Sequence, residues 1–278
     1  MSHELIFNAL LGSFFIAMLA GVLGWLMLLR GQAFAAHALP DIGFSGASVA
    51  LVFGFNPIIG LILASLGGAW IMEGLGFYEK KRDITIDQSA ADRLTGLVLA
   101  GSLAVGMGVL EAAHAPEADT IELLFGGLMH LSVETLWFLG GLSLFCLAGL
   151  FCLYRPLLFA AISPEMATAR GENAWWVGAG FMTLAALGCA ICAEISGALL
   201  AFSLIIGPAS GAFMLNLSPF KGMIFSVLGA LFLSWGGIVL YCLTGWPPAF
   251  WIGIGASFCY GLGLLGRQYF GRSINLTH

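Results

Sequence analysis

Long, unbroken apolar runs are the feature that most limits what this chain can fold into. The segment from Leu10 to Leu29 reads LLGSFFIAMLAGVLGWLMLL and contains no charged residue. A run of about 20 apolar residues is long enough to cross a bilayer as one α-helix. A spanning β-barrel would instead show strands in which polar and apolar residues alternate. The chain is therefore expected to be an all-α integral membrane protein.

Composition supports the same expectation. Of the 278 residues, 60% are hydrophobic and only 9% are charged, and the mean hydropathy is +0.98. A soluble domain carries roughly 25% charged residues, so a soluble globule of this size could not cover its surface. No basic stretch is interleaved with aromatic residues, which argues against nucleic acid as a partner. No linker interrupts the pattern, so residues 1–278 are expected to form a single transmembrane domain surrounded by lipid.

Hydropathy divides the chain into nine segments that are long enough to span a membrane. A further apolar stretch, Ile121 to Met129, is too short to cross and predicts a half-helix at the outer interface. The count falls to eight if one segment is re-entrant. The nine predicted spans are 8–29, 33–55, 57–78, 93–112, 133–154, 174–194, 197–216, 221–243 and 248–266.

The basic residues predict the orientation of these spans, because short cytoplasmic loops collect lysine and arginine. With nine spans, all ten basic residues fall on one side of the membrane. This arrangement places the N-terminus outside and the C-terminus in the cytoplasm. The ten residues are Arg30, Lys80, Lys81, Arg82, Arg93, Arg155, Arg170, Lys221, Arg267 and Arg272.

His37 and Asp41 are the strongest candidates for function within the spans. Ionisable side chains are costly inside a membrane and usually mark a functional site there. The two residues are four apart in AFAAHALPDIGF, a spacing that puts both side chains on one face of a helix. An imidazole and a carboxylate together suit a divalent first-row metal ion. Pro40 lies between them, so the helix is expected either to bend or to begin there.

Two other ionisable residues are weaker candidates for the same chemistry. Glu194 lies where the sixth predicted span meets the outer surface, and His130 lies near the outer interface in LLFGGLMHLS. Either side chain could line the mouth of a path, or it could simply be solvated by water at the interface.

One predicted cytoplasmic segment reads as a short helix with its own caps. Ser163 can cap the N-terminus, Pro164 suits the first turn, and Glu165 complements the helix dipole. Arg170 precedes Gly171, which suits a left-handed stop. A minimal connection between two spans needs no such helix. The segment is therefore expected to be either an ordinary surface helix or a docking element for a cytoplasmic partner.

Several of these segments, taken together, resemble the membrane permeases of the ABC-3 family of zinc, manganese and iron ABC importers. The resemblance covers almost the whole chain and is carried by five motifs in the right order. They are AHALPDIGFSGA at 36–47, the Asp92-to-Gly96 start of the fourth span, LLFGGLMHLS at 123–132, RPLLFAAISPEMATARG at 155–171 and ISGALLAFSLIIGPASGA at 195–212.

The resemblance implies a permease subunit of the bacterial plasma (inner) membrane that conducts a divalent metal ion, zinc or manganese first, by alternating access. It implies a homodimer with its path at the subunit interface, driven by cytoplasmic ABC ATPase subunits and supplied by an extracytoplasmic metal-binding protein. His37 matches the family's pathway histidine, and residues 163–171 match the coupling helix. Many members carry an aspartate where this chain has Ala33, and often a glycine at the position of Asp41.

Three other functions compete with metal import. A permease for a larger cargo, such as a siderophore or cobalamin, should lack a narrow His/Asp constriction. An ion-coupled secondary carrier should show inverted repeats with broken helices, which the sequence does not display. An intramembrane enzyme is not indicated, since H-E-x-x-H is absent, and the absence of a Walker A motif assigns ATP hydrolysis to a partner. No cofactor bound by this chain is expected beyond the transported metal.

Overall fold

The computed structural model describes residues 3–81, 88–127, 132–162 and 174–274, and this part of the chain is helical with no β-strand. The apolar runs explain why, since an α-helix satisfies all its backbone hydrogen bonds within one segment. The helices are α1 (His3–Leu29), α2 (Ala35–Val52), α3 (Pro57–Lys81), α4 (Gln88–Ala112), α5 (Glu117–Phe125), α6 (Val133–Ile162), α8 (Ala174–Ser196), α9 (Ala198–Met214), α10 (Pro219–Thr244) and α11 (Pro248–Ile274).

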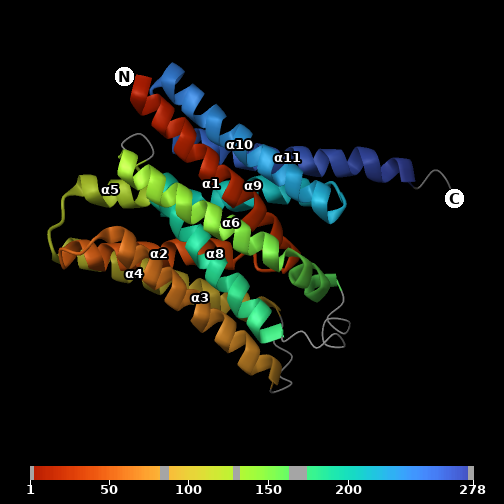
Figure 1. The fold of residues 1–278 in the computed structure, drawn as a ribbon, viewed down its shortest axis with the longest axis horizontal. Coiled ribbons are helices and arrows are strands. Elements are labelled where there is room, and N and C mark those ends of the chain that lie inside the picture. Colours follow the sequence, from red (N-terminus) through yellow and green to blue (C-terminus); the bar gives the residue numbers. More distant parts are fainter. Residues whose placement is uncertain (1–2, 82–87, 128–131, 163–173, 275–278) are drawn as a thin grey trace.

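The helices match the predicted spans closely. Eight of those in the described ranges are long and apolar enough to cross a bilayer, and the ninth candidate, α9, is shorter with 17 residues. A helix of that length still lies within the range of about 17–25 residues seen for crossing helices. The half-helix predicted near Ile121 is present as α5, which has nine residues. In Figure 1, α1 begins at one end of the bundle and α11 finishes toward the opposite end.

Helices α1, α2 and α8 occupy the centre of the bundle. Their apolar windows are mostly buried, whereas α4 and α11 expose most of theirs at the periphery. Helix α2 packs against α3 and α4 and also contacts α8 and α9, which come from the far half of the sequence. Any side chain on α2 is therefore surrounded by helices from both halves of the chain.

A single glycine forms the corner between α8 and α9. Gly197 adopts φ 86° and ψ 150°, a conformation that residues with a side chain rarely adopt. Gly126, with φ 82°, follows α5 and packs backbone-to-backbone against this corner. The corner lets α9 return through the bundle directly, and it fixes α5 across the outer ends of α2, α8 and α9.

Close glycine contacts hold α2 against α3. A Cβ added to Gly60 would collide with the carbonyl oxygen of Gly46 and would lie 2.6 Å from Cβ of Ala50. Lipid tails are as apolar as the side chains, so helices in a membrane associate largely through such close packing. By contrast, a Cβ on Gly67 of the same helix would meet nothing within 4 Å.

This difference predicts the outcome of one substitution at two sites on α3. Gly60→Val should force α2 and α3 apart and destabilise the protein by about 1–3 kcal/mol, the usual cost of overpacking. Gly67→Val is the matched control and should melt like the parent. Thermal unfolding of the detergent-solubilised protein measures both, and equal melting temperatures for the two variants would contradict the packing described here.

The orientation predicted from the basic residues is tested by labelling. In a cysteine-free background, a cysteine at Trp246, between α10 and α11, should react with a membrane-impermeant thiol reagent applied from outside the cell. A cysteine at Lys81, at the end of α3, should react only after the membrane is opened. Labelling of the cysteine at Lys81 from outside the cell would contradict the predicted orientation.

Candidate functional site

His37 and Asp41 lie on one unbroken helix. The chain turns after α1, and α2 begins at Ala35, so His37 is in its first turn. Pro40 lies inside α2 and does not begin it, which decides between the two arrangements that the sequence left open. Ser65 of α3 donates a hydrogen bond of 3.1 Å to the carbonyl oxygen of Leu39, and this bond ties α3 to the turn that carries both candidates.

The two side chains face one another as their spacing predicts. Nδ1 of His37 lies 3.8 Å from Oδ2 of Asp41. This separation is longer than a hydrogen bond, for which about 2.7–3.2 Å is usual. The Asp41 side chain is completely buried, whereas 33% of the His37 side chain is exposed. The pair therefore has one closed end and one open end, and His37 is at the open end.

The burial of Asp41 is the most unusual property of the site. Within the described part of the chain, neither oxygen of its carboxylate has a hydrogen-bond partner, and neither does Nδ1 of His37. Buried polar groups are normally hydrogen-bonded, and a buried carboxylate without a partner is costly. The unsatisfied atoms belong to two residues whose facing nitrogen and oxygen are 3.8 Å apart, so this pair has unmet capacity for hydrogen bonds or for a ligand.

Two aromatic rings border the imidazole of His37. The ring of Phe202, from α9, lies 4.8 Å from it between centroids, and the ring of Phe34, from the turn before α2, lies at 6.4 Å. Phe202 could not be singled out from the sequence, because one phenylalanine in an apolar run carries no signal. These rings give the exposed side of His37 an apolar rim.

The weaker candidates do not join this pair. Glu194 is half-buried in the last turn of α8, whereas His37 is in the first turn of α2. His130 and the segment 163–171 lie outside the described residues. In the ranges that the structure describes, no group of three or more His, Cys, Asp or Glu side chains is arranged to hold a metal ion. Within those ranges, His37 and Asp41 form a pair and not part of a larger group.

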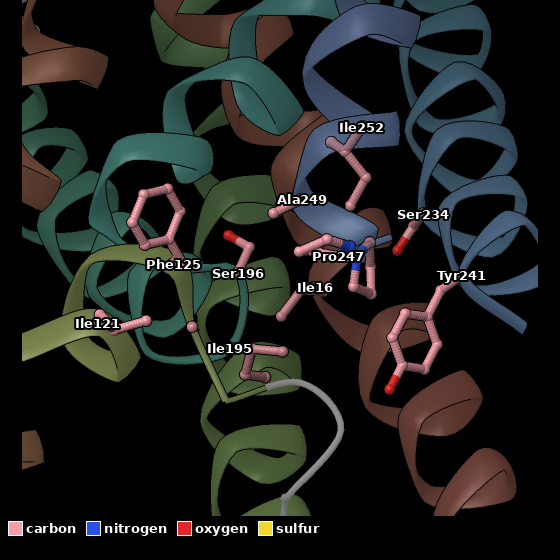
Figure 2. A pocket seen from close by; sticks show the side chains of 12 residues that line it. Ile16, Ile121, Phe125, Ile195, Ser196, Ser234, Tyr241, Pro247, Ala249 and Ile252 are labelled. Atoms are coloured by element: carbon pink, nitrogen blue, oxygen red, sulfur yellow. The ribbon is translucent and has the colours of Figure 1, made fainter. Parts of the chain in front are cut away.

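A separate cavity of about 440 Å³ lies among the middle of α1, the end of α8, α10 and the start of α11, beside α5. Figure 2 shows mainly apolar side chains around it, with the hydroxyl-bearing residues Ser196, Ser234 and Tyr241 among them. Its lining includes neither His37 nor Asp41 and contains no carboxylate or imidazole. It does not suit a metal ion.

The sequence analysis also missed Glu73, although the signal was present. Glu73 lies within the third apolar run, and the rule that selected Glu194 applies to it equally. In the structure it pairs with Arg30, directly after α1. The pair lies at the α1 end of the short turn that joins α1 to α2, and His37 lies just beyond the other end of that turn.

Known proteins resemble this chain over most of its length. A manganese transport system membrane protein, MntC, from Halalkalibacterium halodurans is 24% identical over 90% of this chain and 88% of its own. A high-affinity zinc uptake system membrane protein, ZnuB, from Haemophilus influenzae is 24% identical over 95% and 98%. The solved structure of PsaBC from Streptococcus pneumoniae in complex with Fab superposes with a TM-score of 0.83 at 20% identity, over 98% of this chain and 96% of that one.

The structural likeness confirms the all-α permease fold expected from the sequence, and the apolar helices make the chain a multi-pass protein of the bacterial inner membrane. The model of one family, described as the ABC 3 transport family, matches residues 2–264. Because this match spans nearly the whole chain, the protein belongs to the ABC 3 transport family.

Proposed function

We propose that this chain, as a single permease domain of residues 1–278, conducts a divalent transition metal ion, manganese or zinc, through an ATP-driven importer. The observation that carries the proposal is the buried Asp41 carboxylate, which faces Nδ1 of His37 and lacks a hydrogen-bond partner among the described residues. The curated relatives with manganese or zinc in their names support metal as the cargo, in preference to a siderophore or cobalamin.

A second copy of the chain would complete the site. Two ligands are too few for a zinc ion, which is usually four-coordinate. In a two-fold homodimer, two copies of His37 and two of Asp41 at the axis would supply up to four ligands. Manganese would add water, since it prefers more oxygen ligands. The partly exposed imidazole of His37 supports this arrangement, because one side of the pair is open to a partner.

The energy for import would come from partner subunits. The chain has no Walker A motif, so it is not itself the ATPase, and we assign hydrolysis to two cytoplasmic ABC ATPase subunits. An extracytoplasmic metal-binding protein would deliver the ion to the outer face. The conduction pathway must bind its ion and then release it, which two imidazoles and two carboxylates permit better than a thiolate cage.

The first test removes one ligand at a time. His37→Ala and Asp41→Asn should each lower uptake of radioactive manganese and zinc by about tenfold or more, because a strong charged contact to the ion is lost. Uptake is measured in vesicles that contain the whole complex. His114→Asn is the control, since His114 is an exposed outer residue with φ 52°, a conformation that asparagine tolerates.

The amount of assembled complex should be unchanged in all three variants, as judged by co-purification of the ATPase. Parental uptake by Asp41→Asn, together with loss of uptake in Glu194→Gln, would move the site to the outer end of α8 and refute the assignment.

The segment 163–171 gives a second test. We propose that Ser163, Pro164, Glu165, Arg170 and Gly171 form the coupling helix that docks the ATPase, on the strength of the capping pattern in their sequence. Ala167→Pro would break this helix, so the ATPase should no longer co-purify while the permease still inserts. Ala167→Ser is the control and should retain the ATPase. Normal co-purification of the ATPase with Ala167→Pro would exclude the coupling role.

A further inference from the structure

A mostly buried ion pair lies at the α1 end of the turn that leads to the His37 site. Nη2 of Arg30 is 3.6 Å from Oε1 of Glu73, and the two side chains are only 21% and 15% exposed. Arg30 directly follows α1, and Glu73 belongs to α3. Burial lowers the pKa of the Arg30 guanidinium, while the nearby Glu73 carboxylate opposes that change. One charged contact therefore joins α3 to the residue that follows α1, and these two parts of the chain are distant in sequence.

Helix α8 is shaped around this pair. The guanidinium of Arg30 lies over the ring of Phe181, 4.9 Å from its centroid, and Phe181 is fully buried. One helical turn earlier, Gly178 leaves the space that the Glu73 carboxylate fills, because a Cβ at this position would collide with Oε1. The same Cβ would lie 3.4 Å from Nη2 of Arg30. Any side chain at position 178 would thus displace the ion pair.

Backbone hydrogen bonds restrain the turn between Arg30 and α2, so a shift of Arg30 is expected to move the start of α2 as well. The backbone N–H of Gln32 donates to the carbonyl oxygen of Met27 at 2.9 Å, and that of Ala35 donates to Gln32 at 3.1 Å. The N–H of His37 then donates to the carbonyl oxygen of Phe34 at 3.1 Å. Backbone hydrogen bonds are therefore present at every step from the end of α1 through the turn to the first turn of α2.

We propose that Arg30 and Glu73 are positioning residues for metal binding, which hold the α1–α2 turn against α3 and α8 and so fix where the first turn of α2, with His37, lies relative to those helices. The inference rests on the proposed function, because it assumes that His37 and Asp41 bind the ion. Groups that orient metal ligands commonly affect affinity although they do not touch the metal. A charged pair suits this task, since the planar guanidinium can contact a carboxylate at its edge and an aromatic ring at its face.

The test separates positioning from simple support of the fold. Glu73→Gln keeps the shape of the side chain and removes its charge, and Gly178→Ala keeps both charges and moves the carboxylate. Each should weaken equilibrium binding of manganese to the purified complex about tenfold in Kd, with the number of sites unchanged. Gly180→Ala is the control on the same helix, because its Cβ would meet only Cδ1 of Leu153, at 3.4 Å.

The alternatives give different results in the same assay. If the pair only supports the fold, Glu73→Gln and Gly178→Ala will bind manganese with the parental Kd at fewer sites per complex, and the inference is overturned. His37→Ala is measured in parallel to test the proposed function on its own. Parental binding by His37→Ala would overturn both proposals, whereas loss of binding in His37→Ala beside a parental Kd in Gly178→Ala would overturn the positioning role alone.

Discussion

The bilayer's inability to solvate polar groups is the constraint on which the rest of the structure depends. It forces the backbone into helices, and it makes every ionisable side chain within a span costly unless a partner or a ligand is near. Arg30 and Glu73 meet this constraint largely through each other and the Phe181 ring, although Nη1 of Arg30 has no hydrogen-bond partner among the described residues. His37 and Asp41 meet it less well, because Nδ1 of His37 and both carboxylate oxygens of Asp41 have no such partner.

The same constraint explains how the helices are held together. An apolar side chain gains little by leaving lipid for a protein interior, so helix association depends largely on close approach of the helix backbones. Gly60 brings α3 against α2, and Gly24 brings α1 against the carbonyl group of Ile205 on α9. Likewise, the absence of a side chain at Gly178 leaves room for the Arg30–Glu73 ion pair. In each case the missing side chain creates a space that another group fills.

The sequence was a good guide to local features and a poor one to contacts between distant segments. Apolar runs predicted the helices, including the short α5, and a spacing of four placed His37 and Asp41 together despite Pro40. Both predictions follow from helix geometry alone. The contacts of Phe202 with His37 and of Glu73 with Arg30 depend on which helices pack together, and no local pattern encodes that choice.

The two ionisable pairs at either end of the α1–α2 turn differ in a way that fits their proposed roles. The Arg30–Glu73 pair balances opposite charges and needs no further ion. When Asp41 is ionised beside a neutral imidazole, the second pair carries a net negative charge, and a divalent cation would be the natural partner. A pair of opposite charges can hold a helix in place without a ligand, whereas a pair with a net charge and unsatisfied atoms can take up and release an ion. The contrast is the one that the proposed roles, positioning for the first pair and transport for the second, require.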